Sequence, residues 1–159
     1  MEDLAREIGI MLRQKGLTLG FVESATGGLI SKLITDVPNS SDYYKGSIIS
    51  YSNQVKVDLA GVRQETLDKF GAVSPQVAEE MALGGRKALD VDVCLSDTGI
   101  AGPGGATETK PVGLFYLGLS HKGGTFARKL ILNGSREQNR KAAADAVLSW
   151  LKEYLSCLE

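Results

Sequence analysis

The sequence predicts an α/β fold, specifically a three-layer α/β/α sandwich with a mixed β-sheet. Segments with apolar residues at helical spacing alternate with short β-branched runs, which is typical of parallel β-α-β units. Late in the chain, two strand-like runs flank Gly123-Gly124 and predict an antiparallel hairpin, so the sheet should be mixed. The 159 residues contain no obvious linker, and we expect one domain over residues 1–159.

The first half of the chain supplies two strands and four helices. A helix is expected over residues 2–16, because Leu4, Ile8, Met11 and Leu12 recur at helical spacing before Gly16. Residues 17–22 predict a strand and residues 26–36 a helix, followed by a turn at 38–41. A strand over 46–52 then precedes short helices at 53–60 and 64–70.

The second half should hold the remaining strands and two long helices. Ser74-Pro75 predicts a helix start, with a serine cap and proline in the first turn, and the helix should run to about residue 89. Gly84-Gly85 inside it indicates close packing against another element. Strands are expected at 91–97, 112–121 and 125–132, and Ser135 should cap the last helix.

Composition argues against several functional classes. The formal net charge is −1, so neither nucleic acid nor an anionic membrane is an expected partner. The N-terminus is acidic and no apolar run approaches 18 residues, which predicts a soluble, cytoplasmic protein. Cys94 should be buried in a strand, Cys157 lies near the C-terminus, and the single histidine, His121, should occupy a surface turn. We therefore expect no metal site, no disulfide and no cofactor.

The turn after the first strand is the leading candidate for chemistry. The run 17–22 leads into Glu23-Ser24-Ala25-Thr26-Gly27-Gly28, the layout of a strand, a tight turn and a helix start. Backbone N–H groups converge at such a start, so Ser24 could act as a nucleophile beside an oxyanion or phosphate site. A turn of this composition is also a common helix cap without catalytic function.

A second candidate is the glycine-rich loop over residues 99–110. It is not a P-loop, because Gly99-x4-Gly104 is followed by Gly105-Ala106 instead of Lys-Ser/Thr. A strand instead of a helix follows it, which also excludes a dinucleotide-binding turn. It follows the carboxyl end of a strand, where α/β proteins bind ligands, and Lys110 could add charge; the alternative is a long surface connection.

Six strings, in order, resemble one family. They are Glu23-Ser24-x-Thr26-Gly27-Gly28, Thr35-Asp36-Val37-Pro38-x-Ser40-Ser41, Tyr51-Ser52-Asn53-x-x-Lys56, Gly71-Ala72-Val73-Ser74, Thr98-Gly99-Ile100-Ala101-Gly102-Pro103-x-Gly105 and Lys110-Pro111-Val112-Gly113. Across nearly the whole chain, the sequence resembles the CinA C-terminal domain family, which contains bacterial nicotinamide mononucleotide (NMN) deamidase.

The resemblance implies hydrolysis of the NMN carboxamide to nicotinic acid mononucleotide and ammonia. It implies that Ser24 and Lys56 form the catalytic pair, with Tyr51 and Thr98 beside them, and that the protein is a homodimer. CinA proteins proper carry an additional N-terminal domain whose activities are not carried over. Three positions depart from the family pattern. Ala25 stands where the family usually has cysteine, Ser135 stands where it usually has aspartate, and Ala106 stands where a glycine is common.

The chemistry can also be considered from the residues alone. Amide hydrolysis needs a nucleophile, a base and oxyanion donors, and without a suitable histidine a neutral lysine is the economical base. Lys56 fills that role unless it is an ordinary solvated helix lysine. Arg136 and Arg140 oppose the dipole of the last helix, which favours a bound anion such as the NMN phosphate, although a solvated helix face would also explain them. The expected substrate-contacting residues are Thr26, Gly27, Gly28, Gly99, Gly102, Gly105, Lys110, Arg136 and Arg140.

The leading hypothesis is a Ser–Lys amidase acting on NMN. One alternative is a non-catalytic nucleotide-binding module of the same fold, suggested by the departures at Ala25 and Ser135. The other is an amidase for a different small amide. Ammonia release separates the three hypotheses: release from NMN supports the NMN amidase, binding of NMN without release supports the module, and release from other amides only supports the different amidase.

Overall fold

The computed structural model describes residues 2–158 and contains a five-stranded mixed sheet. The strand order is β2-β1-β3-β4-β5. β1 (Leu19–Glu23) is parallel to both β2 (Tyr44–Ile49) and β3 (Val93–Gly99). β4 (Leu114–His121) pairs antiparallel with β3 and with β5 (Gly124–Ile131), so the predicted hairpin and mixed sheet are confirmed.

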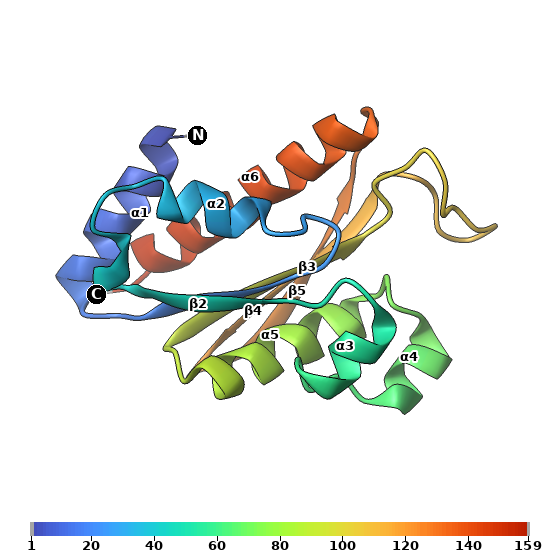
Figure 1. The fold of residues 1–159 in the computed structure, drawn as a ribbon, viewed down its shortest axis with the longest axis horizontal. Coiled ribbons are helices and arrows are strands. Elements are labelled where there is room, and N and C mark those ends of the chain that lie inside the picture. Colours follow the sequence, from blue (N-terminus) through green and yellow to red (C-terminus); the bar gives the residue numbers. More distant parts are fainter. Residues whose placement is uncertain (1, 159) are drawn as a thin grey trace.

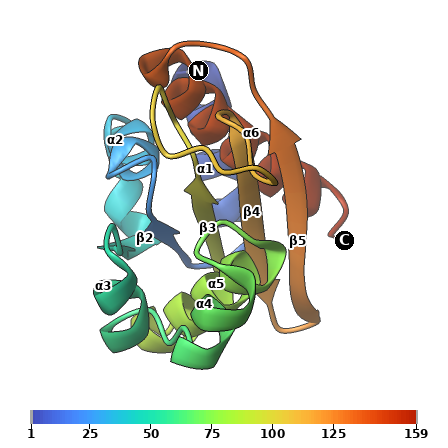
Figure 2. The same cartoon turned by 90° about the vertical axis from the view of Figure 1, so that its right-hand side faces the viewer.

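Helices cover both faces of this sheet (Figure 1). On one face lie α1 (Glu2–Lys15), α2 (Leu29–Thr35) and α6 (Arg136–Ser156). On the other lie α5 (Pro75–Leu89) and the short helices α3 (Asn53–Asp58) and α4 (Gln64–Phe70); a 3₁₀ turn, η1 (Ser40–Asp42), precedes β2. Figure 2 shows β2 and β5 at opposite edges of the sheet. The α/β/α sandwich is confirmed.

Each face of the sheet is packed by its own apolar cluster. Phe21 and Leu95 belong to the cluster under α1, α2 and α6, whereas Val22 and Cys94, their neighbours in β1 and β3, belong to the cluster under α5. This alternation follows the two-residue period of a strand. Burial raises the pKa of the Cys94 thiol to about 12, as expected for a structural cysteine inside the sheet.

The two long helices α5 and α6 begin as the sequence predicts. Ser74 Oγ accepts a hydrogen bond from Val77 N at 3.2 Å, with Pro75 in the first turn of α5. Ser135 Oγ accepts from Gln138 N at 3.2 Å, and Gln138 Oε1 accepts from Ser135 N at 2.9 Å, which completes a capping box for α6. Ser135 therefore caps α6 without a carboxylate at this position.

Two predicted boundaries were wrong for reasons that matter at the site. α2 begins at Leu29 instead of 26, because Gly27 and Gly28 have φ values of 56° and 107° and cannot continue a right-handed helix. β2 ends at Ile49 instead of 52, since Ser52 turns away to cap α3 by accepting from Val55 N. Both differences place extra loop at the carboxyl ends of the strands.

The glycine pair in α5 marks a close approach, as predicted. A Cβ on Gly84 would lie 1.8 Å from Ala60 O, in the turn after α3. A Cβ on Gly85 would lie 2.2 Å from Val22 Cγ2 in β1. These contacts hold the α3 region and β1 against the same helix, and thereby fix their relative positions.

We predict that Gly84→Ala destabilises the protein by about 1–3 kcal/mol, because backbone must move to admit the methyl group. Helix propensity alone would give the opposite sign, a gain of about 1 kcal/mol. Urea unfolding followed by circular dichroism measures the difference. Gly104→Ala is the control, because nothing lies within 4 Å of its added Cβ; stabilisation by Gly84→Ala would refute the close-approach explanation.

Candidate active site

The carboxyl ends of β1, β2 and β3 meet at one end of the sheet and enclose a cavity of about 230 Å³. This end lies on the right of Figure 1, below the start of α6. The lining comes from five separate segments of the chain: Ser24, Ala25, Tyr51, Asn53, Lys56, Ala72, Val73, Thr98, Gly99, Ala101 and Arg136. The four residues expected to be catalytic therefore line one cavity.

Lys56 is buried beside Ser24. Its side chain is only 2% exposed, although lysine is among the residues least often buried. Its Nζ lies 3.0 Å from Ser24 Oγ, 2.8 Å from Ser50 O and 3.2 Å from Tyr51 O. The interpretation of Lys56 as a solvated helix lysine is wrong.

The protonation of Lys56 follows from this burial. Desolvation lowers the pKa of the Lys56 ammonium, and the negative charge of Asp97 acts in the opposite direction. A neutral amine has two N–H donors and one lone pair. The two carbonyl oxygens can take the donors, and the lone pair can accept the Ser24 hydroxyl proton. The three contacts thus suit a lysine acting as base toward Ser24.

The start of α2 does not offer the open anion site expected from the sequence, because Glu23 already occupies it. Glu23 is fully buried, and its Oε1 accepts from Gly28 N at 3.0 Å and Ile30 N at 2.9 Å. Its Oε2 accepts from Ser31 N at 2.9 Å. A carboxylate at a helix N-terminus is electrostatically favourable, so these amides are committed to the protein's own side chain.

The Ser24 turn is held from beneath by Asp97, a fully buried residue of β3. Asp97 Oδ1 accepts from Ser24 N at 3.1 Å and Oδ2 accepts from Thr26 N at 3.2 Å. Burial raises the pKa of Asp97 to about 6, opposed by its hydrogen bonds to Thr26 and Ser24. Asp97 thus fixes the backbone on both sides of Ala25.

Several residues expected to contact substrate instead support this turn. Thr26 is fully buried, so its side chain is not available to a ligand. Arg140 Nε and Nη2 donate to Ala25 O and Thr26 O at 3.0 and 2.9 Å, which explains an arginine in the first turns of α6 without a bound anion. Gly27 and Gly28 shape the turn through their positive φ, and neither lines the cavity.

At the mouth of the cavity, Arg136 and Tyr51 lie together. Arg136 Nη2 donates to Tyr51 Oη at 3.1 Å and its Nη1 donates to Gly102 O at 3.0 Å. Tyr51 is 62% exposed, so its ring is open to a ligand at the rim. Deeper inside, Thr98 Oγ1 donates to Ala72 O at 2.8 Å. Of the two arginines expected at a phosphate, only Arg136 lines the cavity.

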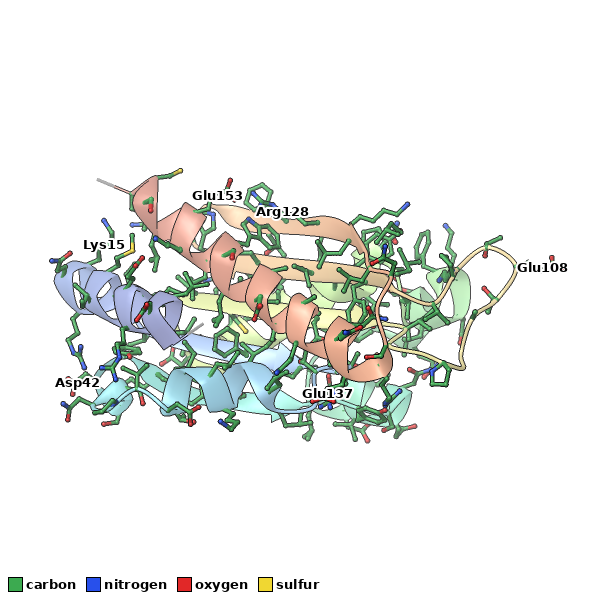
Figure 3. The ribbon with its side chains drawn as sticks, turned by 90° about the horizontal axis from the view of Figure 1, so that it is seen from above. Lys15, Asp42, Glu108, Arg128, Glu137 and Glu153 are labelled. Atoms are coloured by element: carbon green, nitrogen blue, oxygen red, sulfur yellow. The ribbon has the colours of Figure 1, made fainter. Side chains whose placement is uncertain are left out.

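The glycine-rich loop extends away from the body of the protein. Figure 3 shows Glu108 at its tip, at the same end of the molecule as Glu137 in the first turn of α6. Lys110 Nζ donates to Phe70 O at 2.6 Å and ties the base of the loop to α4. Within the loop only Gly99 and Ala101 line the cavity; Gly102, Gly105 and Lys110 do not.

A larger cavity of about 450 Å³ lies at the opposite end of the sheet, where Lys15, Arg86 and His121 are among its lining residues. His121 is packed against Tyr154, with ring centroids 4.5 Å apart. This cavity holds no nucleophile paired with a base, so the smaller cavity is the candidate site.

Within residues 2–158, no group of three or more His, Cys, Asp or Glu side chains could hold a metal ion. None of the helices there is long and apolar enough to cross a membrane.

Sequence reasoning missed the roles of Glu23, Asp97 and Arg140. A signal was present for Asp97, because a carboxylate within an apolar strand run must find donors or leave a costly unpaired group. Glu23 also stood at a strand end before a helix start, where an acidic side chain can cap. For Arg140 the only signal was its unfavourable place in the helix dipole, which also fits a ligand site.

We predict that Glu23→Gln destabilises the protein by about 1–3 kcal/mol, because its amide group would direct N–H donors at backbone N–H groups. The free energy of unfolding in urea measures the effect. Glu108→Gln at the exposed loop tip is the matched control and should stay within about 0.5 kcal/mol of the parent. Equal effects of the two substitutions would contradict the assigned role of Glu23.

Comparisons with known proteins show which family this chain is similar to. The family model for the CinA C-terminal domain matches residues 1–155. A CinA-like protein from Rippkaea orientalis is 46% identical over 97% of this chain, and the chain spans 38% of that relative's length. The crystal structure of the competence/damage inducible protein CihA from Agrobacterium tumefaciens aligns with a TM-score of 0.93 at 36% identity, covering 98% of this chain and 94% of that one.

A second crystal structure, the competence damage-inducible protein A (ComA) from Klebsiella pneumoniae, aligns with a TM-score of 0.96 at 26% identity over 99% of this chain and 98% of that one. The curated relatives are therefore longer proteins, whereas the solved structures match over nearly their full length. Together the family model, the sequence relatives and the shared fold show that this chain belongs to the CinA C-terminal domain family.

Proposed function

We propose that this protein is a Ser–Lys amidase that hydrolyses the carboxamide of NMN to nicotinic acid mononucleotide and ammonia. One observation carries the proposal: a buried lysine whose pKa is lowered by desolvation lies 3.0 Å from the hydroxyl of a serine that lines a cavity. Membership of the CinA C-terminal domain family supports the choice of substrate, as does the resemblance of six sequence strings to that family.

In the first step, Ser24 Oγ attacks the carboxamide carbon while Lys56 Nζ takes the hydroxyl proton. The carbonyl oxygen becomes an oxyanion, and Ala25 N–H is the proposed donor to it. Ala25 lines the cavity next to the nucleophile, and within residues 2–158 its N–H has no protein acceptor. Asp97 and Arg140 would hold that N–H in place by fixing the backbone around it.

The tetrahedral intermediate then collapses, and the proton on Lys56 Nζ passes to the departing nitrogen, which leaves as ammonia. The acyl group is now an ester on Ser24. Water attacks this ester with Lys56 again acting as base, and the carboxylic acid product leaves as Ser24 recovers its proton. Each step uses the same Ser24–Lys56 contact.

The cavity of about 230 Å³ is proposed to hold the nicotinamide end of the substrate. The ribose and phosphate would then lie at the mouth, near the exposed side chains of Tyr51 and Arg136. Arg136 is a natural phosphate ligand there, because its guanidinium is already oriented by Gly102 O and Tyr51 Oη.

We predict that Ser24→Ala and Lys56→Met each lower kcat for ammonia release roughly 10³-fold or more, and that the double mutant is scarcely worse than either. The reason is that the two residues act as one unit. Lys45→Met, an exposed lysine in β2, is the matched control and should leave kcat unchanged. Additive losses would show that the two residues act independently.

Activity should fall as pH falls through the lowered pKa of Lys56, because protonation removes the lone pair that receives the serine proton. A profile of kcat/KM against pH measures this acidic limb, which should lie below the ordinary pKa of a lysine, 10.5. A limb at or above that value would contradict a desolvated base.

Arg136→Ala should raise KM for NMN far more than KM for the dephosphorylated riboside, because only NMN carries the phosphate. Arg140→Ala should instead lower kcat for both substrates, since it loosens the serine turn. Initial-rate kinetics on the two substrates distinguish these results. An equal effect of Arg136→Ala on both would remove the phosphate assignment.

Binding of NMN without ammonia release would favour a non-catalytic module, and release from other amides alone would favour a different substrate.

A cytoplasmic location and homodimeric assembly belong to the same proposal, and light scattering of the purified protein tests the assembly.

A further inference from the structure

The hydroxyl of Thr26 lies between two buried carboxyl groups. Its Oγ1 is 2.7 Å from Glu23 Oε1 and 2.5 Å from Asp97 Oδ1, and all three residues are fully buried. Both separations are those of hydrogen bonds, yet a threonine hydroxyl has one hydrogen. One of the two carboxyl groups must therefore supply a second proton.

Glu23 has no place for that proton. Besides Thr26, its two oxygens accept from Gly28 N, Ile30 N and Ser31 N, and from Ser31 Oγ at 2.5 Å. The hydroxyls behind Ser31 form a chain, with Ser47 Oγ 2.7 Å from Ser31 Oγ and Tyr44 Oη 2.6 Å from Ser47 Oγ. Ser31 can therefore give its hydroxyl proton to Oε2 while it accepts from Ser47, and Oε1, which faces Thr26, already accepts from two backbone N–H groups. Both oxygens of Glu23 are thus surrounded by donors at the start of α2.

Asp97 is in the opposite situation. It accepts only the two amide bonds from Ser24 and Thr26, which leaves Oδ1 able to carry a hydrogen toward Thr26 Oγ1. Burial and the charge of Glu23 both raise its pKa, to about 6. Other ionisable groups also face the turn: Lys56 from α3 and Arg140 from α6 contact it, and Arg136 from α6 lines the same cavity.

We propose that Asp97 is a neutral carboxylic acid that donates its proton to Thr26 Oγ1, while the Thr26 hydroxyl donates to ionised Glu23. Asp97 is thereby a positioning residue: it holds the backbone N–H groups of Ser24 and Thr26, and while it keeps its proton it places no second buried negative charge near Lys56. Its significance for catalysis rests on the proposed function. Because an ionised Asp97 raises the pKa of Lys56, the proton on Asp97 and the free amine on Lys56 favour one another.

Infrared spectroscopy of the whole protein tests the protonation directly. At a pH just below 6, the difference spectrum between the parent and Asp97→Asn should contain the carbonyl band of a protonated carboxylic acid, and this band should titrate away with a pKa of about 6. The proposal would be overturned if the parent protein had no such band, or if the band were also present in the spectrum of Asp97→Asn.

Substitutions at Thr26 give an independent test if Asp97→Asn does not fold. Thr26→Ser keeps the hydroxyl and should keep the band in place, whereas Thr26→Val removes the acceptor and should shift it to the higher frequency of a carbonyl in a weaker hydrogen bond. A band that does not respond to Thr26→Val would show that Asp97 does not donate to this hydroxyl. None of these readouts needs substrate, so a failure to hydrolyse NMN would leave them intact.

Unfolding measurements provide the thermodynamic counterpart. A carboxyl group whose pKa is raised in the folded state adds stability at low pH and loses it as pH rises through the folded pKa, here about 6. The contribution of Asp97 should therefore be lost between the ordinary pKa of an aspartate, 3.8, and about 6, so the stability of the parent should fall relative to that of Asp97→Asn over this interval. Parallel curves for the two proteins would contradict a proton held on Asp97.

Discussion

The burial of the Lys56 ammonium group is the constraint on which the rest of the site depends. A lysine 2% exposed must either find a charge partner or lose its proton, and its nearest partners are a serine hydroxyl and two carbonyl oxygens. Desolvation therefore lowers the pKa of Lys56 and makes a base of a residue that is ordinarily an acid. The short helix α3 is held by this burial, by its serine cap and by Val57, which packs against the apolar cluster under α5.

The surrounding structure keeps that arrangement in place. Glu23 occupies the start of α2, Asp97 holds the turn from β3, and Arg140 holds it from α6. Three elements that are distant in the sequence thus converge on Ser24, Ala25 and Thr26. The nucleophile and its supports lie at strand ends and helix starts, and the glycine-rich loop contributes only Gly99 and Ala101 to the cavity lining, as rigid positioning of a nucleophile requires.

The sequence could predict the layers, the mixed sheet, the helix caps at Ser74 and Ser135 and the glycine contact in α5, because local periodicity and turn chemistry determine them. It also singled out Ser24 and Lys56. It did not predict that Glu23 fills the helix start, that Arg140 binds backbone carbonyls or that Lys110 lies outside the cavity. Those outcomes depend on which acceptor each long side chain reaches in three dimensions, and spacing along the chain does not encode that choice.

Nitrogen-15 NMR of the Lys56 amine, assigned by comparison with Lys56→Met, tests the central claim most directly. The account predicts that Nζ titrates clearly below the ordinary lysine pKa of 10.5 and that Ser24→Ala leaves it depressed, because burial is the larger cause. A Lys56 that titrates at or above that value would be a permanent ammonium ion, and it could not serve as the base for Ser24.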